Sequence, residues 1–333
     1  MKSILMGGGK LFSVYTPDTL NKLADIAALS PTPITREEIL ADPGRFAEVE
    51  VIFSTWGMPK FTEEELCTAL PSLRAVFYAA GSVQAFARPF LNRGIRIFSA
   101  WASNAVPVAE YTVAQIILAN KGFYQSCRIM CGGDHKAAKT YFRDMPGNYG
   151  ARIGIIGAGM IGKMVLRRLR DYRLETVTYD PFLSEEAAAE LGTKKVTLEE
   201  LFETCSVITN HVANRPATVG MLHYGLFSRM RETATFINTG RGAQVVEADL
   251  IRALTEHPTR TAVLDVTMPE PPEVGSPFYS LPNVFLTPHI AGSAGDEVAR
   301  MAEQMADAYA LWLKSGETKL DCEVTLPMLE TMA

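Results

Sequence analysis

Short apolar runs alternate with amphipathic segments along the whole chain, in two series. The first series comprises apolar runs at residues 2–7, 49–54, 74–79 and 95–100, separated by helical patterns such as 17–27 and 62–70. The second series comprises runs at residues 152–157, 175–180, 206–211, 233–238, 261–266 and 284–289. Alternating strand and helix signals predict parallel sheets that are covered by helices. Two such series therefore predict two α/β domains.

One long helix is predicted between the two series, over residues 104–131. Glu110 and Lys121 interrupt its apolar face, which favours a buried or bridging helix over a membrane span. The stretch 131–150 is polar, contains several glycines and a proline, and predicts a connection or an arm. A last helix is expected over residues 296–314.

The composition of the 333 residues is that of a soluble globular protein, with 47% apolar and 21% charged residues. The net charge of −5 gives no support to nucleic acid or an anionic membrane as a partner. The five cysteines lack the spacing of a zinc site, so no metal is expected, and Cys127 and Cys131 are predicted to be buried thiols. Because the sequence shows no signal peptide or anchor, a cytoplasmic location is expected.

A glycine motif, Gly157-x-Gly159-x-x-Gly162, directly follows the first apolar run of the second series and opens a helical segment. In a dinucleotide-binding turn the first glycine permits the tight turn, the second lets the backbone approach the pyrophosphate, and the third lets helix and strand pack closely. The helix N-terminus then receives the anion. Asp180 ends the next predicted strand, where an acid binds the adenine ribose diol and disfavours a 2′-phosphate. The motif therefore predicts NAD as the cofactor.

Three polar residues stand at or just beyond the predicted ends of later strands, where open α/β sheets place their sites. Arg241 and Glu270 lie just past two predicted strands, and His289 ends a third. Hydride transfer from an alcohol to NAD needs a base for the hydroxyl proton, and imidazole titrates in the right range. A carboxylate beside the ring holds its tautomer, and an arginine fork binds a carboxylate or a carbonyl oxygen. These three residues are the candidate catalytic residues.

With these motifs the chain resembles the D-isomer-specific 2-hydroxyacid dehydrogenases, which include glyoxylate/hydroxypyruvate reductases and phosphoglycerate dehydrogenases. The segments that carry the resemblance are NAVPVAEYTVAQIILA (104–119), GIIGAGMIGK, NTGRGAQVVEADL, LDVTMPEPP and SLPNVFLTPHIAG. The resemblance implies that His289 is the acid/base, Glu270 its partner and Arg241 the substrate-binding cation. Beyond the motif glycines it implies NAD contacts at Met160, Ile161, Asp180, Val212, Thr239, Gly240, Asp265, Ala291 and Gly292. The substrate carboxylate is expected on the backbone amides of Ala80, Gly81 and Ser82.

The family fold implies two doubly wound, Rossmann-like α/β domains with a cleft between them. Residues 1–103 and 296–333 are expected to form a flavodoxin-like substrate domain, and residues 104–295 an NAD-binding Rossmann domain. The implied activity is the NAD-dependent interconversion of a 2-keto acid and a D-2-hydroxy acid. The resemblance also implies a homodimer formed through the NAD-binding domain.

Two other functions remain open on this fold. One is an NAD(H)-sensing protein, such as a co-repressor, that reports the redox state without turnover. The other is formate or phosphite oxidation, although formate enzymes of this group typically carry glutamine in place of the carboxylate partner, where this chain has Glu270.

The chain departs from the family pattern in two segments. The substrate loop is AGSVQAF, where a Gly-Val-Asp-Asn type of sequence is usual, and HVANRPAT stands where many members carry Leu-Pro. His211 in the second segment is interpreted as part of the cofactor wall and not as a second catalytic histidine.

Overall fold

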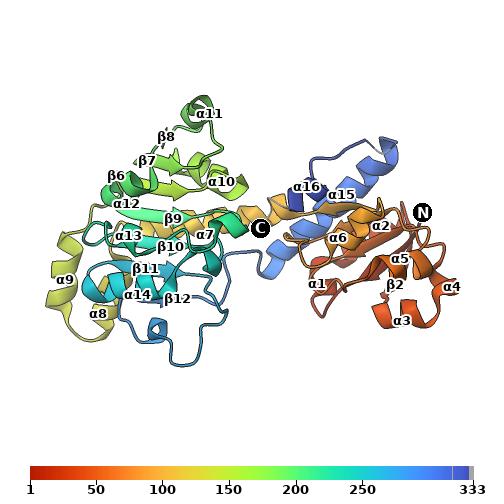
Figure 1. Ribbon diagram of the computed structural model, residues 1–333, viewed down its shortest axis with the longest axis horizontal. Helices are drawn as coiled ribbons and strands as arrows, with labels where there is room; N and C mark the ends of the chain where they lie inside the picture. The colour runs from red at the N-terminus through yellow and green to blue at the C-terminus, as the bar shows by residue number, and fades with distance from the viewer. Residues whose placement is uncertain (317, 330–333) are drawn as a thin grey trace. The chain divides into compact units, whose positions relative to one another are not determined.

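The chain divides into two units, and the computed structural model describes residues 1–316 and 318–329. The first unit comprises Met1–Ala105 and Ser293–Ala333, and the second unit comprises Val106–Gly292. Each unit contains one sheet (Figure 1). Buried apolar side chains cover both faces of each sheet. None of the helices in the described ranges is both long enough and apolar enough to cross a membrane.

The sheet of the first unit has the strand order β13-β5-β4-β3-β1-β2. Its strands are β1 (Lys2–Met6), β2 (Ala28–Pro33), β3 (Val51–Ser54), β4 (Ala75–Tyr78), β5 (Arg96–Ser99) and β13 (Glu323–Val324). All pairs are parallel except β13 with β5. The order of the first five strands, 2-1-3-4-5, is the flavodoxin-like order. The structure therefore confirms the predicted flavodoxin-like fold of this part.

The helices of the first unit flank this sheet. They are α1 (Leu11–Val14), α2 (Pro17–Ala24), α3 (Arg36–Ala41), α4 (Pro43–Phe46), α5 (Glu63–Ala69), α6 (Ala87–Asn92), α15 (Ala299–Lys314) and α16 (Leu326–Leu329). Threonines begin several of them: Thr35 and Thr62 each form a reciprocal capping box with a glutamate three residues later. On one face of the sheet, Tyr309 and Trp312 of α15 pack edge-on against Phe77 of β4.

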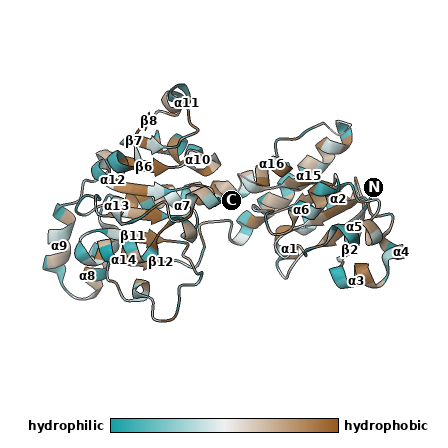
Figure 2. Ribbon diagram, in the orientation of Figure 1, coloured by the Kyte–Doolittle hydropathy of each residue, from teal (hydrophilic) through white to brown (hydrophobic). Residues whose placement is uncertain are grey.

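The sheet of the second unit has the strand order β12-β11-β10-β9-β6-β7-β8, with every pair parallel. Its strands are β6 (Tyr149–Ile156), β7 (Arg173–Tyr179), β8 (Lys194–Lys195), β9 (Val207–Asn210), β10 (Thr235–Asn238), β11 (Thr261–Leu264) and β12 (Val284–Leu286). Read from β8, six of these strands follow the order 3-2-1-4-5-6, which is the order of dinucleotide-binding sheets. Both sheets carry their most hydrophobic residues on the central strands (Figure 2).

In the second unit three helices precede the first strand, and helices and strands then alternate from β6 to β11. The helices are α7 (Trp101–Ala119), which begins in the first unit, α8 (Phe123–Cys131), α9 (His135–Arg143), α10 (Met160–Leu169), α11 (Glu185–Glu190), α12 (Leu198–Thr204), α13 (Tyr224–Phe227) and α14 (Glu247–Glu256). Short 3-10 turns lie at Pro216–Thr218, Gly242–Gln244 and Pro277–Tyr279, and a fourth, Gly295–Val298, precedes α15 in the first unit.

The structure corrects three of the sequence-based expectations around α7. The predicted helix 104–131 is two helices, because Gly122 adopts a positive φ of 63° and the chain turns there. The predicted connection 131–150 contains α9, whose N-cap Asp134 accepts a hydrogen bond from the backbone N–H of Ala137 at 2.8 Å. Cys127 and Cys131 are exposed, and not buried; the residue of α8 that packs inside is Gln125.

Candidate functional site

The glycine motif forms a tight turn between β6 and α10. Gly157 has a φ of 92°, and a Cβ there would lie 3.0 Å from the backbone of His211 and Val212. A Cβ on Gly162 would lie 2.0 Å from the carbonyl oxygen of Gly157, so only glycine lets α10 approach the strand this closely. Gly159 faces open space and is the N-cap of α10, with no side chain capping the helix. The first-turn amides of this ten-residue helix, including those of Met160 and Ile161, are therefore available to an anion.

Asp180 lies at the end of β7, beside this turn. One carboxylate oxygen accepts a hydrogen bond from the Ala158 N–H at 2.7 Å, and the other accepts one from the Phe182 N–H at 2.8 Å. The carboxylate thus fixes the loop after β6 and the loop after β7 relative to each other. Available helix amides, open space above Gly159 and an acid after the second strand are the features that a dinucleotide requires, so the residues present fit the predicted cofactor.

Arg241 stands in the loop after β10, on a framework of buried amides. The side chain of Asn210 donates to Asn238 Oδ1 at 3.0 Å and to Gln244 Oε1 at 2.5 Å. Gln244 Oε1 also accepts from the Arg241 N–H at 3.2 Å, and Gln244 Nε2 donates to the Val212 carbonyl at 2.6 Å. This network ties the loops after β9 and β10 together and holds Thr239 and Gly240 within them. Burial lowers the pKa of the Arg241 guanidinium from its usual value, and the negative charge of Glu270 opposes that shift.

His289 and Glu270 face each other across two loops that follow β11 and β12. Nδ1 of His289 lies 2.7 Å from Oε1 of Glu270, which is a short, charge-assisted distance. The sequence prediction that His289 ends a strand is wrong, because β12 stops at Leu286 and His289 adopts a φ of 55° in the following loop. Glu270, the predicted partner, is thus a neighbour of His289 in the structure. The loop of Glu270 is held by Glu247, which accepts a hydrogen bond from the Met268 N–H at 2.7 Å.

Asp265 holds the loop that carries His289. Its buried carboxylate accepts three hydrogen bonds, from the Thr287 hydroxyl at 2.6 Å, the Ile290 N–H at 2.8 Å and the Ala291 N–H at 2.9 Å. The Asp265 carbonyl also accepts from the His289 N–H at 3.1 Å. The unusual backbone conformation of His289 is therefore fixed from both sides by one residue of the neighbouring loop.

In the first unit, the loop of Ala80, Gly81 and Ser82 follows β4 at the carboxyl edge of the sheet. The Ser99 hydroxyl donates to the carbonyls of Ala80 and Gly81, at 2.9 and 2.5 Å, which turns those carbonyls away from the loop surface. Within residues 1–316 and 318–329, no hydrogen bond uses the N–H of Gly81 or Ser82. These two amides are free donors for an anion.

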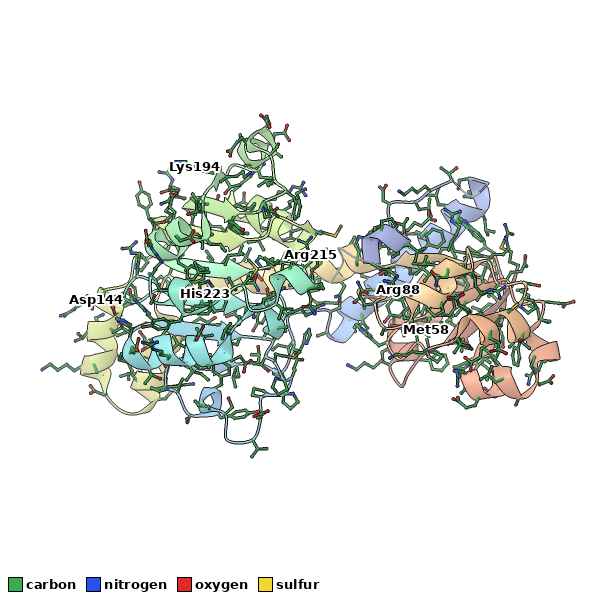
Figure 3. The ribbon with its side chains drawn as sticks, viewed as in Figure 1. Met58, Arg88, Asp144, Lys194, Arg215 and His223 are labelled. Atoms are coloured by element: carbon green, nitrogen blue, oxygen red, sulfur yellow. The ribbon has the colours of Figure 1, made fainter. Side chains whose placement is uncertain are left out.

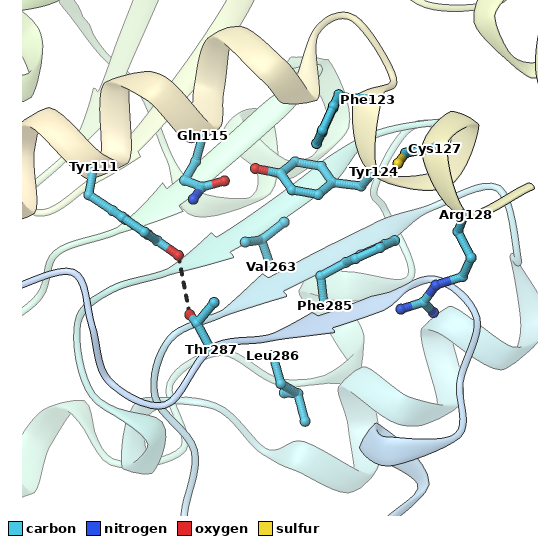
Figure 4. A pocket seen from close by; sticks show the side chains of 10 residues that line it. All are labelled: Tyr111, Gln115, Phe123, Tyr124, Cys127, Arg128, Val263, Phe285, Leu286 and Thr287. Carbon is cyan, nitrogen blue, oxygen red and sulfur yellow. Dashed lines mark hydrogen bonds between the residues drawn. The ribbon is translucent and has the colours of Figure 1, made fainter. Parts of the chain in front are cut away.

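A mainly apolar cavity of about 420 Å³ lies elsewhere in the second unit, between α7, α8 and the strands β11 and β12 (Figure 4). Tyr111 and Thr287 both line this cavity and share a hydrogen bond of 3.2 Å. The described part of the chain holds no group of three or more metal-ligating side chains.

The comparison with known families decides the classification. Residues 113–291, more than half of the chain, match the model described as "D-isomer specific 2-hydroxyacid dehydrogenase, NAD binding domain". The chain belongs to this family. The matched residues 113–291 all lie within the second unit.

Relatives within the 2-hydroxyacid dehydrogenase family agree over most of the chain. A glyoxylate reductase of Korarchaeum cryptofilum is 31% identical over 247 residues, 74% of either chain. The D-3-phosphoglycerate dehydrogenase of Archaeoglobus fulgidus is 28% identical over 90% of this chain and 57% of its own length. The human D-3-phosphoglycerate dehydrogenase is 30% identical over 64% of this chain and 39% of its own length. The chain thus spans about two fifths to three fifths of the phosphoglycerate dehydrogenases it matches.

Solved structures of similar proteins have the same fold as this chain. The D-mandelate dehydrogenase of Rhodotorula graminis matches with a TM-score of 0.80 at 19% identity, covering 97% of both chains. A D-2-hydroxyisocaproate dehydrogenase matches with a TM-score of 0.78 at 18% identity, covering 97% of this chain and 99% of that one. The predicted fold class, with a Rossmann sheet beside a flavodoxin-like sheet, is confirmed.

Sequence reasoning found the motif residues but missed the side chains that support them. Asn210, Asn238 and Gln244 were not singled out, although two of them stand beside residues that were. Thr287 was missed as well. One signal in the sequence could have indicated them: Asn210 and Asn238 are polar residues at the ends of two apolar runs. A buried polar side chain needs hydrogen-bond partners.

His211 makes the stability of this family member depend on pH. Its ring is buried between the hydroxyls of Thr209 and Thr239, at 3.1 and 3.3 Å, and burial lowers the pKa of His211 to about 3. The unfolded chain takes up a proton near pH 6.5 and the folded chain does not. Stability is therefore full above about pH 6.5 and falls by about 1.4 kcal/mol for each pH unit below it, down to the folded pKa.

Urea unfolding between pH 7.5 and pH 5 measures this effect. The difference in unfolding free energy between the natural protein and the His211→Gln variant is expected to shrink as the pH falls. His135→Gln, at an exposed histidine of α9, is the control and is expected to leave the pH slope unchanged. Equal slopes for the natural protein and His211→Gln would contradict a neutral buried ring.

Proposed function

We propose that the chain is an NAD-dependent oxidoreductase that interconverts a 2-keto acid and a D-2-hydroxy acid. The observation that supports this most directly is the pairing of His289 with Glu270 at 2.7 Å, on loops at the same edge of the sheet as the glycine turn. A histidine held by a carboxylate is a suitable acid/base, and this edge is where doubly wound sheets bind dinucleotides.

In this proposal the two units and their site residues have separate roles. The second unit binds the dinucleotide at the amides of α10 and at Asp180. Val212, Thr239 and Gly240 provide further contacts to it. Bound NADH supplies the hydride. His289 donates the proton to the keto oxygen, and Glu270 holds the ring so that Nε2 carries that proton. Arg241 binds the substrate by its guanidinium and polarises the carbonyl.

The first unit contains the loop that the proposal assigns to the substrate carboxylate. The free N–H groups of Gly81 and Ser82 suit a substrate carboxylate, because two adjacent amides bind an anion without needing a side-chain cation. Tyr78 is the last residue of β4, two positions before this loop, and burial raises its pKa to about 12, so its hydroxyl stays neutral. The loop therefore recognises one anionic group through its backbone.

Steady-state reduction of a panel of 2-keto acids with NADH tests the proposal. Turnover of at least one member is expected, and Arg241→Gln is expected to raise KM for the keto acid more than the KM for NADH, since the guanidinium contacts the substrate. A protein that binds NADH but shows no turnover with any keto acid or with formate would instead be an NAD(H) sensor. Oxidation of formate or phosphite alone would assign the third function.

We also propose a cytoplasmic homodimer formed through the second unit. Three large apolar side chains stand exposed on α8 and α9: Phe123, Met130 and Phe142, with 40 to 50% of their surface accessible. Exposed apolar groups close together indicate a protein contact. All five cysteines are free, two of them buried, which suits a reducing compartment. Sedimentation equilibrium is expected to give twice the chain mass of 36.5 kDa, and Phe123→Ser is expected to shift the protein towards the monomer.

A further inference from the structure

An arginine and an aromatic ring meet across the glycine turn, in a position that the family motifs leave without a role. Phe182 follows β7 and Arg215 follows β9, while β6 and its glycine turn lie between those two strands. The guanidinium carbon of Arg215 lies 5.2 Å from the centre of the Phe182 ring. Figure 3 labels Arg215 within the second unit. The pair therefore bridges the two loops that flank the turn.

Packing does not account for this pair. Phe182 is 77% exposed, so its ring fills no core. Within the described ranges Arg215 makes no ion pair with a carboxylate, and its Nε is buried without an acceptor. An exposed aromatic face beside a guanidinium without an anion offers a stacking surface and a charge to a ligand.

The position identifies the part of the ligand that the pair meets. Asp180 accepts a hydrogen bond from the Phe182 N–H, so the ring stands two residues beyond the acid that contacts the adenine ribose in this kind of sheet. An adenosine is therefore the ligand group expected at this end. A purine base stacks on an aromatic or guanidinium plane, and a guanidinium binds phosphate with two parallel hydrogen bonds.

We propose that Phe182 and Arg215 form the adenosine end of the dinucleotide site, and that Arg215 binds a phosphate on the ribose 2′ position, so that NADP(H) binds besides NAD(H). The inference rests on the dinucleotide site of the proposed function. Asp180 opposes it by charge repulsion, but two backbone N–H groups already bind that carboxylate and offset part of its field. Arg215 supplies the opposite charge from the other side of the turn.

Calorimetric titration of the full chain with 5′-ADP and with 2′,5′-ADP tests the proposal without turnover. The natural protein is expected to bind 2′,5′-ADP at least as tightly as 5′-ADP. Arg215→Thr is expected to weaken 2′,5′-ADP about tenfold or more, as the loss of a charge-assisted hydrogen bond does, and 5′-ADP about threefold or less. Phe182→Leu, which keeps the cation, is expected to weaken both nucleotides about threefold through lost stacking.

Arg173→Thr is the matched control, because Arg173 stacks on Tyr149 at 5.9 Å at the opposite end of β7. It is expected to leave both affinities unchanged. The inference is overturned if the natural protein binds 2′,5′-ADP more than about tenfold weaker than 5′-ADP, or if Arg215→Thr weakens both equally. If neither nucleotide binds, the dinucleotide site of the proposed function fails as well. Circular dichroism and thermal unfolding confirm that each variant is folded.

Discussion

Replacing His289 by glutamine is expected to lower kcat for keto-acid reduction by about 10²–10⁴-fold, the usual contribution of a positioned acid/base. The amide keeps a hydrogen-bonding side chain beside Glu270 but has no proton to transfer in the neutral pH range. Affinity for NADH is expected to change little, because the first-turn amides of α10 and the Asp180 carboxylate do not depend on the imidazole. Stopped-flow measurement of NADH oxidation, with NADH binding followed separately by fluorescence, separates the two effects.

The exposed His135 of α9 provides the control for this experiment. His135→Gln removes an imidazole from the same unit and is expected to turn over at the natural rate. A His289→Gln protein that binds NADH and reduces the keto acid normally would remove the acid/base from the proposal. The Glu270→Gln variant, which leaves the imidazole without a carboxylate, is expected to retain an intermediate rate.

The Gly162→Ala substitution is expected to lower the free energy of unfolding by about 1–3 kcal/mol or more. The added methyl group would stand 2.0 Å from the Gly157 carbonyl oxygen, and the obstacle is backbone, which cannot rotate away. The α10 helix must move off β6, and this displaces the helix amides that receive the dinucleotide. Both the urea midpoint and the affinity for NADH are therefore expected to fall together.

Gly159→Ala is the matched comparison within the same turn. A methyl group there meets nothing within 4 Å, so the unfolding free energy is expected to stay close to that of the natural protein. Affinity for NADH is expected to fall, because the methyl group occupies the space through which the pyrophosphate approaches the backbone. Equal stability losses in both variants would contradict the steric account of the motif.

Much of the fold could be predicted from sequence because buried parallel strands form continuous apolar runs. The predicted runs 74–79 and 152–157 lie within a few residues of the observed strands β4 and β6. His289 was misplaced because the run VFLTPH continues past the last strand pairing, which ends at Leu286. Only the pairing partner, β11, determines where that strand stops. A single chain segment carries no such information.

The side chains that support the site could not be predicted from the sequence, for a related reason. Asn210 and Gln244 meet because β9 and β10 are neighbours in register, and Phe182 and Arg215 meet because β6 lies between their strands. These contacts join residues about 30 positions apart and depend on strand order. The exposure of Cys127 and Cys131 likewise depends on which face of α8 packs, since helical spacing alone places both thiols on one face without saying which way it points.

The outer strands of the two sheets have consequences for aggregation. The strand β2 contains Pro31 and Pro33, and proline has no N–H to offer a further strand. The sheet of the second unit ends at β8, which consists of two lysines. At the other margin of the first sheet, β13 is only two residues long. Short, charged or proline-bearing margins resist edge-to-edge growth between molecules. Concentrated solutions of this protein should consequently remain free of fibrillar assembly, and contacts between chains should form through side-chain surfaces and not by continuing a hydrogen-bond ladder.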